Sequence, residues 1–183
     1  MALNTLPNEG LTSRGYPSDR IVTPIIINGD MSVAQRGTST SSVTSSGYYA
    51  CDRWDTNISS LGTWTISQST DVPSGQGFAN SMKWDCTTAD ASPSASDNLI
   101  IQQHIEGQNL QLLKKGTSSA EAVTHSFWIK SNKTGTYTVS LRDTDNSRHI
   151  CKQFTISSAD TWEKKILTFA GDTTGAFDDD NAK

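Results

Sequence analysis

The chain has 183 residues, which is enough for one domain of ordinary size with a core of its own. Its formal net charge is −4 and its lysines and arginines are not clustered, which argues against binding to a nucleic-acid backbone. Hydrophobic residues make up only 34% of the chain, serine and threonine are abundant, and five tryptophans and thirteen glycines are present, a composition that favours an all-β protein.

Residues 1–24 are polar and irregular, and proline and glycine interrupt them repeatedly. Neither a helix nor a long strand is expected in such a segment, and it cannot form a core alone. We predict an extended docking arm over residues 1–24 that is held by a partner protein or by another copy of the chain. Packing of the arm on its own domain is the alternative. No signal peptide and no membrane span are predicted, because a basic region and a long apolar run are both missing.

From residue 25 onward, short strand-like segments alternate with loops rich in turn-forming residues. This spacing predicts a single β-sandwich or barrel over residues 25–183. The predicted strands are residues 25–28, 31–36, 48–54, 62–68, 80–86, 97–105, 122–131, 135–143, 147–156 and 162–169.

Residues 26–54 carry the most distinctive pattern. An apolar entry runs into an Asn28-Gly29 turn, a short alternating strand follows from Met31, and a serine and threonine tract leads to residues 48–54. No ordinary catalytic motif has this form. The pattern consists of Asn28, Gly29, Met31, Val33, Ala34, Gln35, Arg36, Gly37, Thr38, Ser39, Tyr49, Asp52, Arg53 and Trp54.

The clearest predicted hairpin joins residues 123–130 to residues 136–142. In its second strand, apolar and polar residues alternate, which is typical of a strand with one buried face. The predicted inward residues of that strand are Tyr137, Val139 and Leu141. One short helix is predicted, over residues 106–115, and Gly116 ends it.

The entry pattern resembles the opening of the jelly-roll domains in bacteriophage tail fibres and related virion proteins. Residues 101–107, 126–131 and 161–165 follow in the order found in carbohydrate-binding-module-like jelly rolls. The resemblance covers residues 26–170 and implies a galactose-binding-like jelly-roll β-sandwich, a homotrimer, and a place on the virion exterior after assembly in the host cytoplasm. It implies structural roles for Gln35, Arg36, Asp52, Arg53, Trp54, Glu106 and Trp162.

The end of the chain departs from that resemblance. In such jelly rolls, at least one more long strand follows the segment that corresponds to residues 161–165, whereas residues 178–183 are acidic and lack a strand pattern. We expect either a fragment of a longer protein, truncated at the C-terminal edge of its sandwich, or an unpaired sheet edge that a neighbouring chain covers.

No catalytic constellation stands out, and we predict a protein that is not an enzyme. Most acidic residues lie in turns rather than as a facing pair, no nucleophile elbow is present, and the glycine-rich residues 73–78 lead into a strand. Glu106 is interpreted as a hydrogen-bonding anchor where strand turns to helix. Asp52 and Arg53, beside Trp54, are interpreted as an internal ion pair or as a stack on the indole ring.

No cofactor is expected, because the cysteines form no C-x-x-C pair and only three histidines are present. We expect the cysteines to be small buried hydrophobic residues, with a single disulfide as the alternative. They are Cys51, Cys86 and Cys151. A structural calcium is the alternative to a metal-free protein, with carboxylates from Asp30, Asp52 and Asp55.

Tryptophan rings can act as platforms for sugars, since one face of a sugar ring is apolar. Trp54 and Trp162 are expected in the core, whereas Trp128 lies opposite in phase to its apolar neighbours and is expected to face outward. The predicted glycan-binding or chain-contact face consists of Trp128, Trp64, Lys130, Arg142, Gln102 and His104.

The function that the resemblance implies is that of a virion structural protein. We expect a tail-fibre subunit in which residues 1–24 anchor to other virion proteins and the β-sandwich acts as a spacer or as a host-glycan adhesin. The alternatives are a non-catalytic carbohydrate-binding module of a longer glycan-degrading protein and a capsid-decorating fibre. Neither nucleic-acid binding nor membrane insertion is expected.

Overall fold

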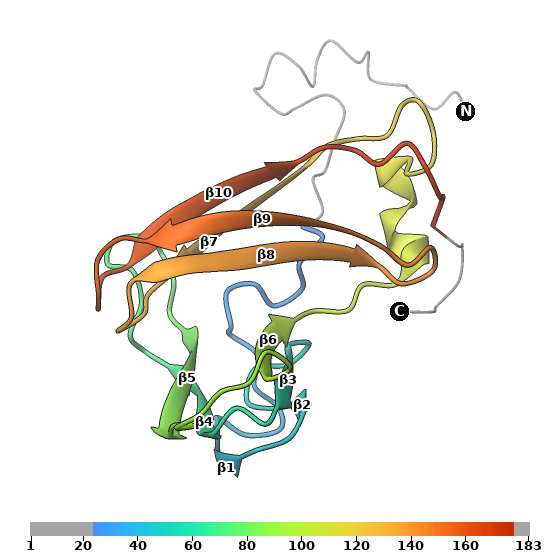
Figure 1. Cartoon of the computed structure of the whole chain (residues 1–183). Helices are drawn as coiled ribbons and strands as arrows, with labels where there is room; N and C mark the ends of the chain where they lie inside the picture. The colour runs from blue at the N-terminus through green and yellow to red at the C-terminus, as the bar shows by residue number, and fades with distance from the viewer. Residues whose placement is uncertain (1–23, 178–183) are drawn as a thin grey trace, which may run out of the picture.

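The computed structural model describes residues 24–177, which form an all-β domain with one short 3-10 helix, as predicted for the fold class (Figure 1). The strands are β1 Ser39–Val43, β2 Gly47–Tyr48, β3 Asp55–Ser59, β4 Thr63–Ser69, β5 Ser81–Thr88, β6 Asn98–Gln102, β7 Val123–Ile129, β8 Gly135–Asp143, β9 Arg148–Ile156 and β10 Glu163–Phe169. Helix η1, Gly107–Leu113, lies between β6 and β7. The predicted arm, apart from Pro24, and the acidic tail at residues 178–183 lie outside the described residues.

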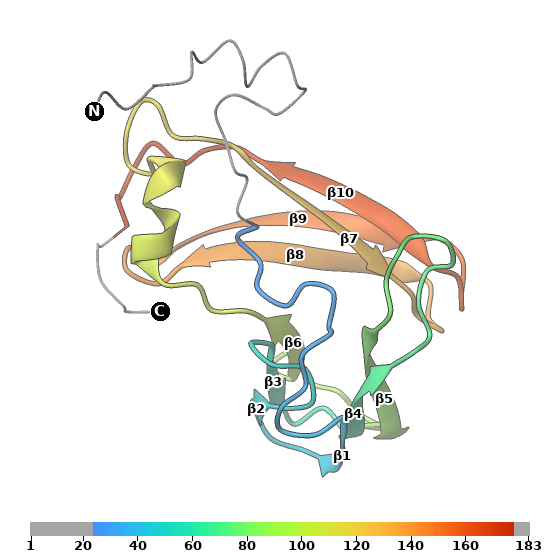
Figure 2. The ribbon, with the colours of Figure 1, turned by 180° about the vertical axis from the view of Figure 1, so that it is seen from behind.

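The strands pair in four small antiparallel sheets, with the orders β1-β4-β5, β2-β3-β6, β7-β10 and β8-β9. Strands β7 to β10 run beside one another, and strands β1 to β6 lie together below them (Figures 1 and 2). The strand order of a jelly roll, with two larger sheets, is not seen within residues 24–177. In this part of the chain, no helix combines the length and the apolar character needed to cross a bilayer.

The three strands predicted first, at residues 25–28, 31–36 and 48–54, are wrong. Of these residues only Tyr48 belongs to a strand, the short β2, and the others form turns and loops. Four residues of these segments have left-handed backbone, which an extended strand does not allow: Asn28 (φ 53°), Met31 (φ 58°), Ala50 (φ 50°) and Arg53 (φ 71°). Conversely, β1 lies within the serine and threonine tract, where a loop is expected.

The predicted hairpin between residues 123–130 and 136–142 is also wrong, because β7 pairs with β10 and β8 pairs with β9. The ring of Phe127 on β7 packs edge-on against Phe154 on β9, with centroids 5.2 Å apart, and Tyr137 on β8 stacks on Phe154 at 5.7 Å. The link from β7 to β8 therefore passes between two packed sheets. The alternation within β8 is confirmed, since Tyr137, Val139 and Leu141 are partly buried and the polar residues between them are exposed.

Two apolar clusters hold the strands together. The first joins β1, β3 and β4 through Val43, Ile58 and Ile66, of which Ile66 is fully buried. Burial of one such side chain contributes about 2 kcal/mol to folding. The second is the aromatic cluster around Phe154, and Ile156 and Phe169 are also buried at the ends of β9 and β10.

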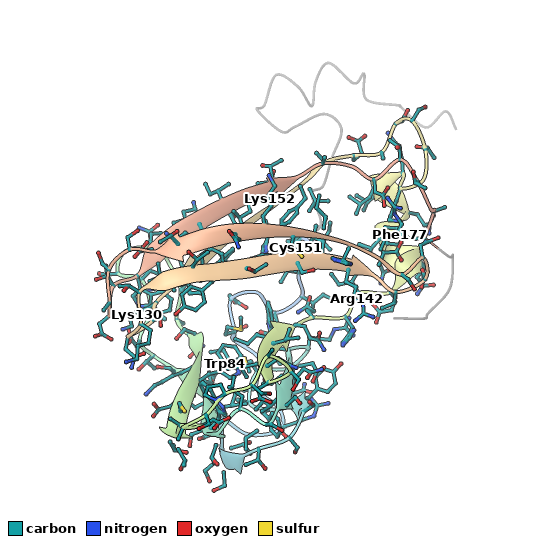
Figure 3. The ribbon with its side chains drawn as sticks, viewed as in Figure 1. Trp84, Lys130, Arg142, Cys151, Lys152 and Phe177 are labelled. Atoms are coloured by element: carbon teal, nitrogen blue, oxygen red, sulfur yellow. The ribbon has the colours of Figure 1, made fainter. Side chains whose placement is uncertain are left out.

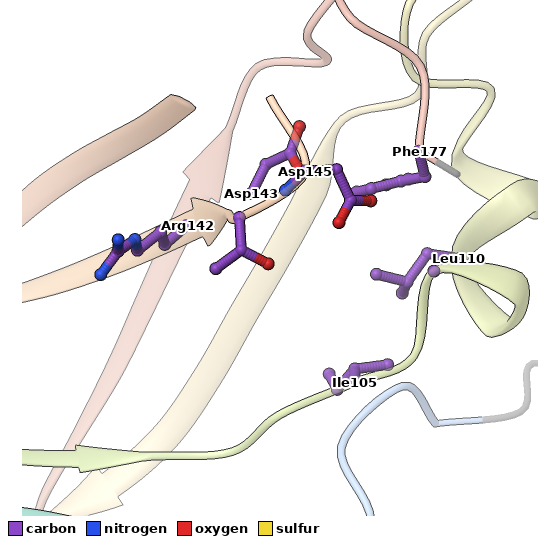
Figure 4. A pocket seen from close by; sticks show the side chains of 8 residues that line it. Ile105, Leu110, Arg142, Asp143, Asp145 and Phe177 are labelled. Atoms are coloured by element: carbon purple, nitrogen blue, oxygen red, sulfur yellow. Dashed lines mark hydrogen bonds between the residues drawn. The ribbon is translucent and has the colours of Figure 1, made fainter. Parts of the chain in front are cut away.

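Charged side chains tie the segment after β10 to the turn that follows η1 and to the start of β9. The Nζ of Lys115 lies 2.5 Å from Oδ2 of Asp143 and donates to the carbonyl of Gly175, while Arg148 binds Asp172 through two nitrogens, at 2.6 and 2.9 Å. Phe177 then closes a cavity of about 40 Å³ over η1, whose apolar wall includes Ile105 and Leu110 (Figure 4). A cavity of this size has room for about one water molecule and not for a larger ligand.

Candidate functional site

The entry segment, residues 26–36, is held by side-chain hydrogen bonds in place of strand pairing. The Asn28 side chain donates to the carbonyls of Val33 and Asp52 and accepts from the N–H of Val33, each at 2.9 Å. The carbonyl of Asn28 in turn accepts from Nε1 of Trp54 at 3.0 Å. Asn tolerates the left-handed backbone that this position requires. One asparagine thus joins the two halves of the entry pattern.

Asp52 and Arg53 form ion pairs with residues from other segments, and not with each other. Asp52 accepts from Nη1 of Arg36 at 3.1 Å and from the backbone N–H of Gln35 at 3.2 Å. Arg53 donates to both carboxylate oxygens of Glu106 at 3.3 Å and to the carbonyl of His104 at 3.1 Å. The predicted pair between Asp52 and Arg53, or a stack of Arg53 on Trp54, is therefore wrong in its partners.

Glu106 lies where the link from β6 turns into η1, but its partners in other residues are side chains and not the backbone groups that an anchor at this position was expected to bind. Besides Arg53, its carboxylate accepts from the side chain of Asn109 at 3.2 Å, in the first turn of η1. Its own backbone N–H and the Arg53 guanidinium hold the pKa of Glu106 below its ordinary value. The carboxylate therefore stays ionised and joins the loop at Arg53 to the start of the helix.

These ion pairs line an open groove of about 450 Å³, which is within the size range of small-molecule sites. The groove brings together three segments that are distant in the sequence: the end of the entry loop, the loop after β2, and the link from β6 to η1. Its walls are Gln35, Arg36, Tyr48, Asp52, Arg53, His104 and Glu106. Five of these were predicted as structural residues and His104 as a binding residue.

Tyr48 is the one groove residue that was not predicted to have a structural or binding role. Its side chain is 37% exposed, and the guanidinium of Arg36 lies over its ring at 5.6 Å from the centroid. The adjacent Tyr49 is turned inward against the first apolar cluster. The pair Tyr48-Tyr49 was the signal in the sequence, because adjacent residues of an extended segment point to opposite sides.

The predicted glycan face does not form, since its residues lie apart. Lys130 and Arg142 lie at opposite ends of the group of strands β7 to β10 (Figure 3). Trp128 is partly buried and is paired across the sheet with Lys164 of β10, not with a residue of β8. Trp64 packs on the first apolar cluster, and its Nε1 donates to the carbonyl of Leu61 at 2.6 Å.

The remaining predicted face residues have partners in the chain. The side chain of Gln102 donates to Asp55 at 2.9 Å, and Nε2 of His104 lies 3.5 Å from the same carboxylate. Lys130 contacts Asp71 and lies over the ring of Trp162 at 5.6 Å from the centroid. Trp162 itself donates to Asp71 at 3.0 Å and so takes part in a surface cluster. The prediction that Trp162 lies in the core is wrong.

The carboxylates considered for calcium do not converge. Asp30 accepts from Ser32, Asp52 binds Arg36, and Asp55 accepts from Gln102. Within residues 24–177, no group of three or more histidine, cysteine, aspartate or glutamate side chains is placed to hold a metal ion.

The three cysteines are free thiols, and only one of them is buried. Cys51 lies in the core, where burial and the neighbouring charge of Asp52 raise the pKa of its thiol to about 11. Cys86 and Cys151 are exposed, so the prediction of three buried cysteines is wrong for these two (Figure 3 for Cys151). Both lie on strands whose side chains are mostly exposed at that point.

Comparison of the chain with protein-family models, with curated proteins and with solved structures finds no match.

Proposed function

We propose that this protein is a virion structural protein, a subunit of a phage tail fibre or fibre-like appendage, and that its role is architectural and adhesive rather than catalytic. The resemblance of residues 26–170 to the jelly-roll domains of such fibres supports the proposal, as does the all-β fold of the described residues. Residues 1–24 are the part that we propose to anchor the subunit to other virion proteins.

The main observation behind this proposal is that the residues of the entry pattern bind other residues of the same chain. Its polar side chains bind other parts of the same chain: Asn28 binds Val33, Asp52 binds Arg36, and Arg53 binds Glu106. Residues whose hydrogen bonds and ion pairs hold loops together stabilise a scaffold. Catalytic groups, in contrast, must remain available to a substrate. Architecture therefore accounts for the pattern better than catalysis does.

Exposed isoleucines on the strands support assembly into a homo-oligomer, for which a trimer is the proposed form. They include Ile100 and Ile101 on β6, Ile150 on β9 and Ile166 on β10, each at least 40% exposed. Contact with other copies would remove part of this apolar surface from water and cover strand edges.

Antibodies raised against the folded chain, used to label purified phage particles from a host that carries the gene, test the proposal. We expect gold label on a fibre or fibre-like appendage and the chain's peptides in the same particles by mass spectrometry. Particles that are free of both label and peptides would overturn the proposal, and they would favour a carbohydrate-binding module of a non-virion protein.

A further inference from the structure

We propose that the groove between the entry loop, the loop after β2 and the β6–η1 link binds a neutral, hydroxyl-rich oligosaccharide. The inference rests on the proposed function, since it names the ligand class and the site for the adhesive role. It places that site away from Trp128 and Trp64, where the sequence pattern predicted it.

The groove retains hydrogen-bonding groups that the rest of the described chain does not use. The side-chain amide of Gln35 and the hydroxyl of Tyr48 make no hydrogen bond to any residue in the range 24–177, and Arg36 uses only Nη1. The Arg36 side chain is 59% exposed. Together these groups offer several donors and two acceptors within one concave surface, and a sugar hydroxyl both donates and accepts.

The charged side chains of the groove are paired with one another, which favours a neutral ligand. Arg36 is paired with Asp52 at 3.1 Å and Arg53 with Glu106 at 3.3 Å, so the two arginines and two carboxylates of the groove cancel. A charged ligand would have to compete with an existing ion pair for its counter-charge. A ligand whose hydroxyls hydrogen-bond to the unused groups leaves both pairs intact.

The Arg36 guanidinium and the Gln35 backbone are already held in place. Asp52 and the Tyr48 ring fix the Arg36 guanidinium from two directions, and Asp52 accepts the N–H of Gln35, which sets the direction of that residue's backbone. The carbonyl of Asp52 is in turn bound by Asn28 at 2.9 Å. The Arg36 guanidinium therefore loses less conformational freedom on binding than an unpaired side chain would, which favours a weakly interacting ligand such as a sugar.

Isothermal titration calorimetry with the full chain tests the inference, using neutral tetrasaccharides of glucose, mannose and galactose, and tetragalacturonic acid as the charged comparison. We expect saturable binding of at least one neutral tetrasaccharide, no binding of the acid, and little change in affinity with salt. Tyr48→Ala and Gln35→Ala should each weaken binding about tenfold. Gln153→Ala, which removes an exposed glutamine from β9, is the matched control and should not alter the affinity.

Three results would overturn the inference: no binding of any neutral tetrasaccharide, preference for the acid, or affinities that neither groove variant changes. Thermal unfolding of each variant checks that Tyr48→Ala and Gln35→Ala remain folded, and Tyr48→Phe, which keeps the ring, tests the hydroxyl alone. The labelling of particles is independent of these titrations. Labelled particles without sugar binding overturn the groove and leave the structural role, whereas sugar binding without labelled particles overturns the virion role.

Discussion

Asn28 and Asp52 show how two polar residues hold a loop that has no strand partner. Asn28 supplies both a donor and an acceptor to Val33, and Asp52 accepts from Gln35 and Arg36. The Asp52 side chain is only 15% exposed, so its bonds are partly shielded from water. Hydrogen bonds to such a carboxylate are worth more than those on an open surface.

Replacement of Asp52 by asparagine should therefore destabilise the protein. We expect Asp52→Asn to lower the free energy of unfolding by about 1–2 kcal/mol, because the ion pair with Arg36 is lost and one amide group cannot accept at both positions. Asp85→Asn is the matched control, since the Asp85–Lys83 pair has both side chains 56% exposed and should contribute less than about 0.5 kcal/mol. Urea unfolding of the three proteins measures the difference, and equal losses would contradict this role of Asp52.

At the level of elements, the end of helix η1 is fitted closely against the segment that follows β10. Gly116 has φ 80° and donates its N–H to the carbonyl of Asp172 at 2.8 Å. A Cβ at this position would lie 2.5 Å from the backbone nitrogen of Ala176, which is closer than atoms can approach. The glycine is therefore required both for its backbone angle and for space.

Gly116→Ala should destabilise the protein more than the same change at a glycine with equal backbone strain and free space. Gly75→Ala is that control, because Gly75 has φ 74° and a Cβ added there would have no atom within 4 Å. We expect a loss of about 1 kcal/mol for Gly75→Ala and at least about 2 kcal/mol for Gly116→Ala, by thermal or urea unfolding. Similar losses in the two variants would show that residues 175–176 do not pack on Gly116.

The charged contacts of the same segment predict acid sensitivity. The Arg148 guanidinium and the N–H of Thr174 hold the pKa of Asp172 at about 2. Burial alone would raise the pKa of Asp143, but its bonds to Lys115 and Asn146 outweigh that effect and lower it. A carboxylate with a lowered pKa in the folded state stabilises the fold above its unfolded pKa, and this contribution is lost as the pH falls through the folded value.

The free energy of unfolding should thus fall as the pH is lowered from about 4 towards 2. In Asp172→Asn, the fall over this range should be smaller, because one of the titrating carboxylates is gone. A series of urea unfolding curves at different pH values measures both slopes. Identical slopes for the variant and the parent chain would mean that Asp172 is not bound to Arg148 in solution.

The elements that could be predicted from the sequence are those that local patterns determine. The alternation of Tyr137, Val139 and Leu141 defines the buried face of β8, and the positions of β4 to β10 follow from similar runs. Strand pairing depends on contacts between segments that are distant in the sequence. β7 pairs with β10 and β8 with β9, although the turn residues at 131–135 indicate a hairpin between β7 and β8. The entry loop was mistaken for strands because apolar alternation does not reveal left-handed backbone at Met31 or Arg53.

The candidate site, too, could be predicted only as far as local sequence patterns determine it. The residues of the entry pattern were recognised as a unit, and the structure brings Gln35, Arg36 and Glu106 to one groove. The face around Trp128 and Arg142 depended on a pairing of β7 with β8 that does not exist.

For the whole molecule, the proposed assembly has a direct consequence in solution. Because isoleucines on β6, β9 and β10 are exposed, we expect the isolated chain to associate, with a trimer as the main species. Sedimentation velocity over a range of micromolar concentrations measures the mass. A monomer at every concentration would contradict the trimer and would leave assembly to partner proteins.

Electron cryo-microscopy of intact phage particles that encode the chain tests the proposed virion role most directly. The account predicts density that fits the β-sheets of residues 24–177 on a fibre or fibre-like appendage, in symmetry-related copies, with the groove around Tyr48 and Arg36 facing outward. Particles that have complete fibres and contain no density for this domain would contradict it.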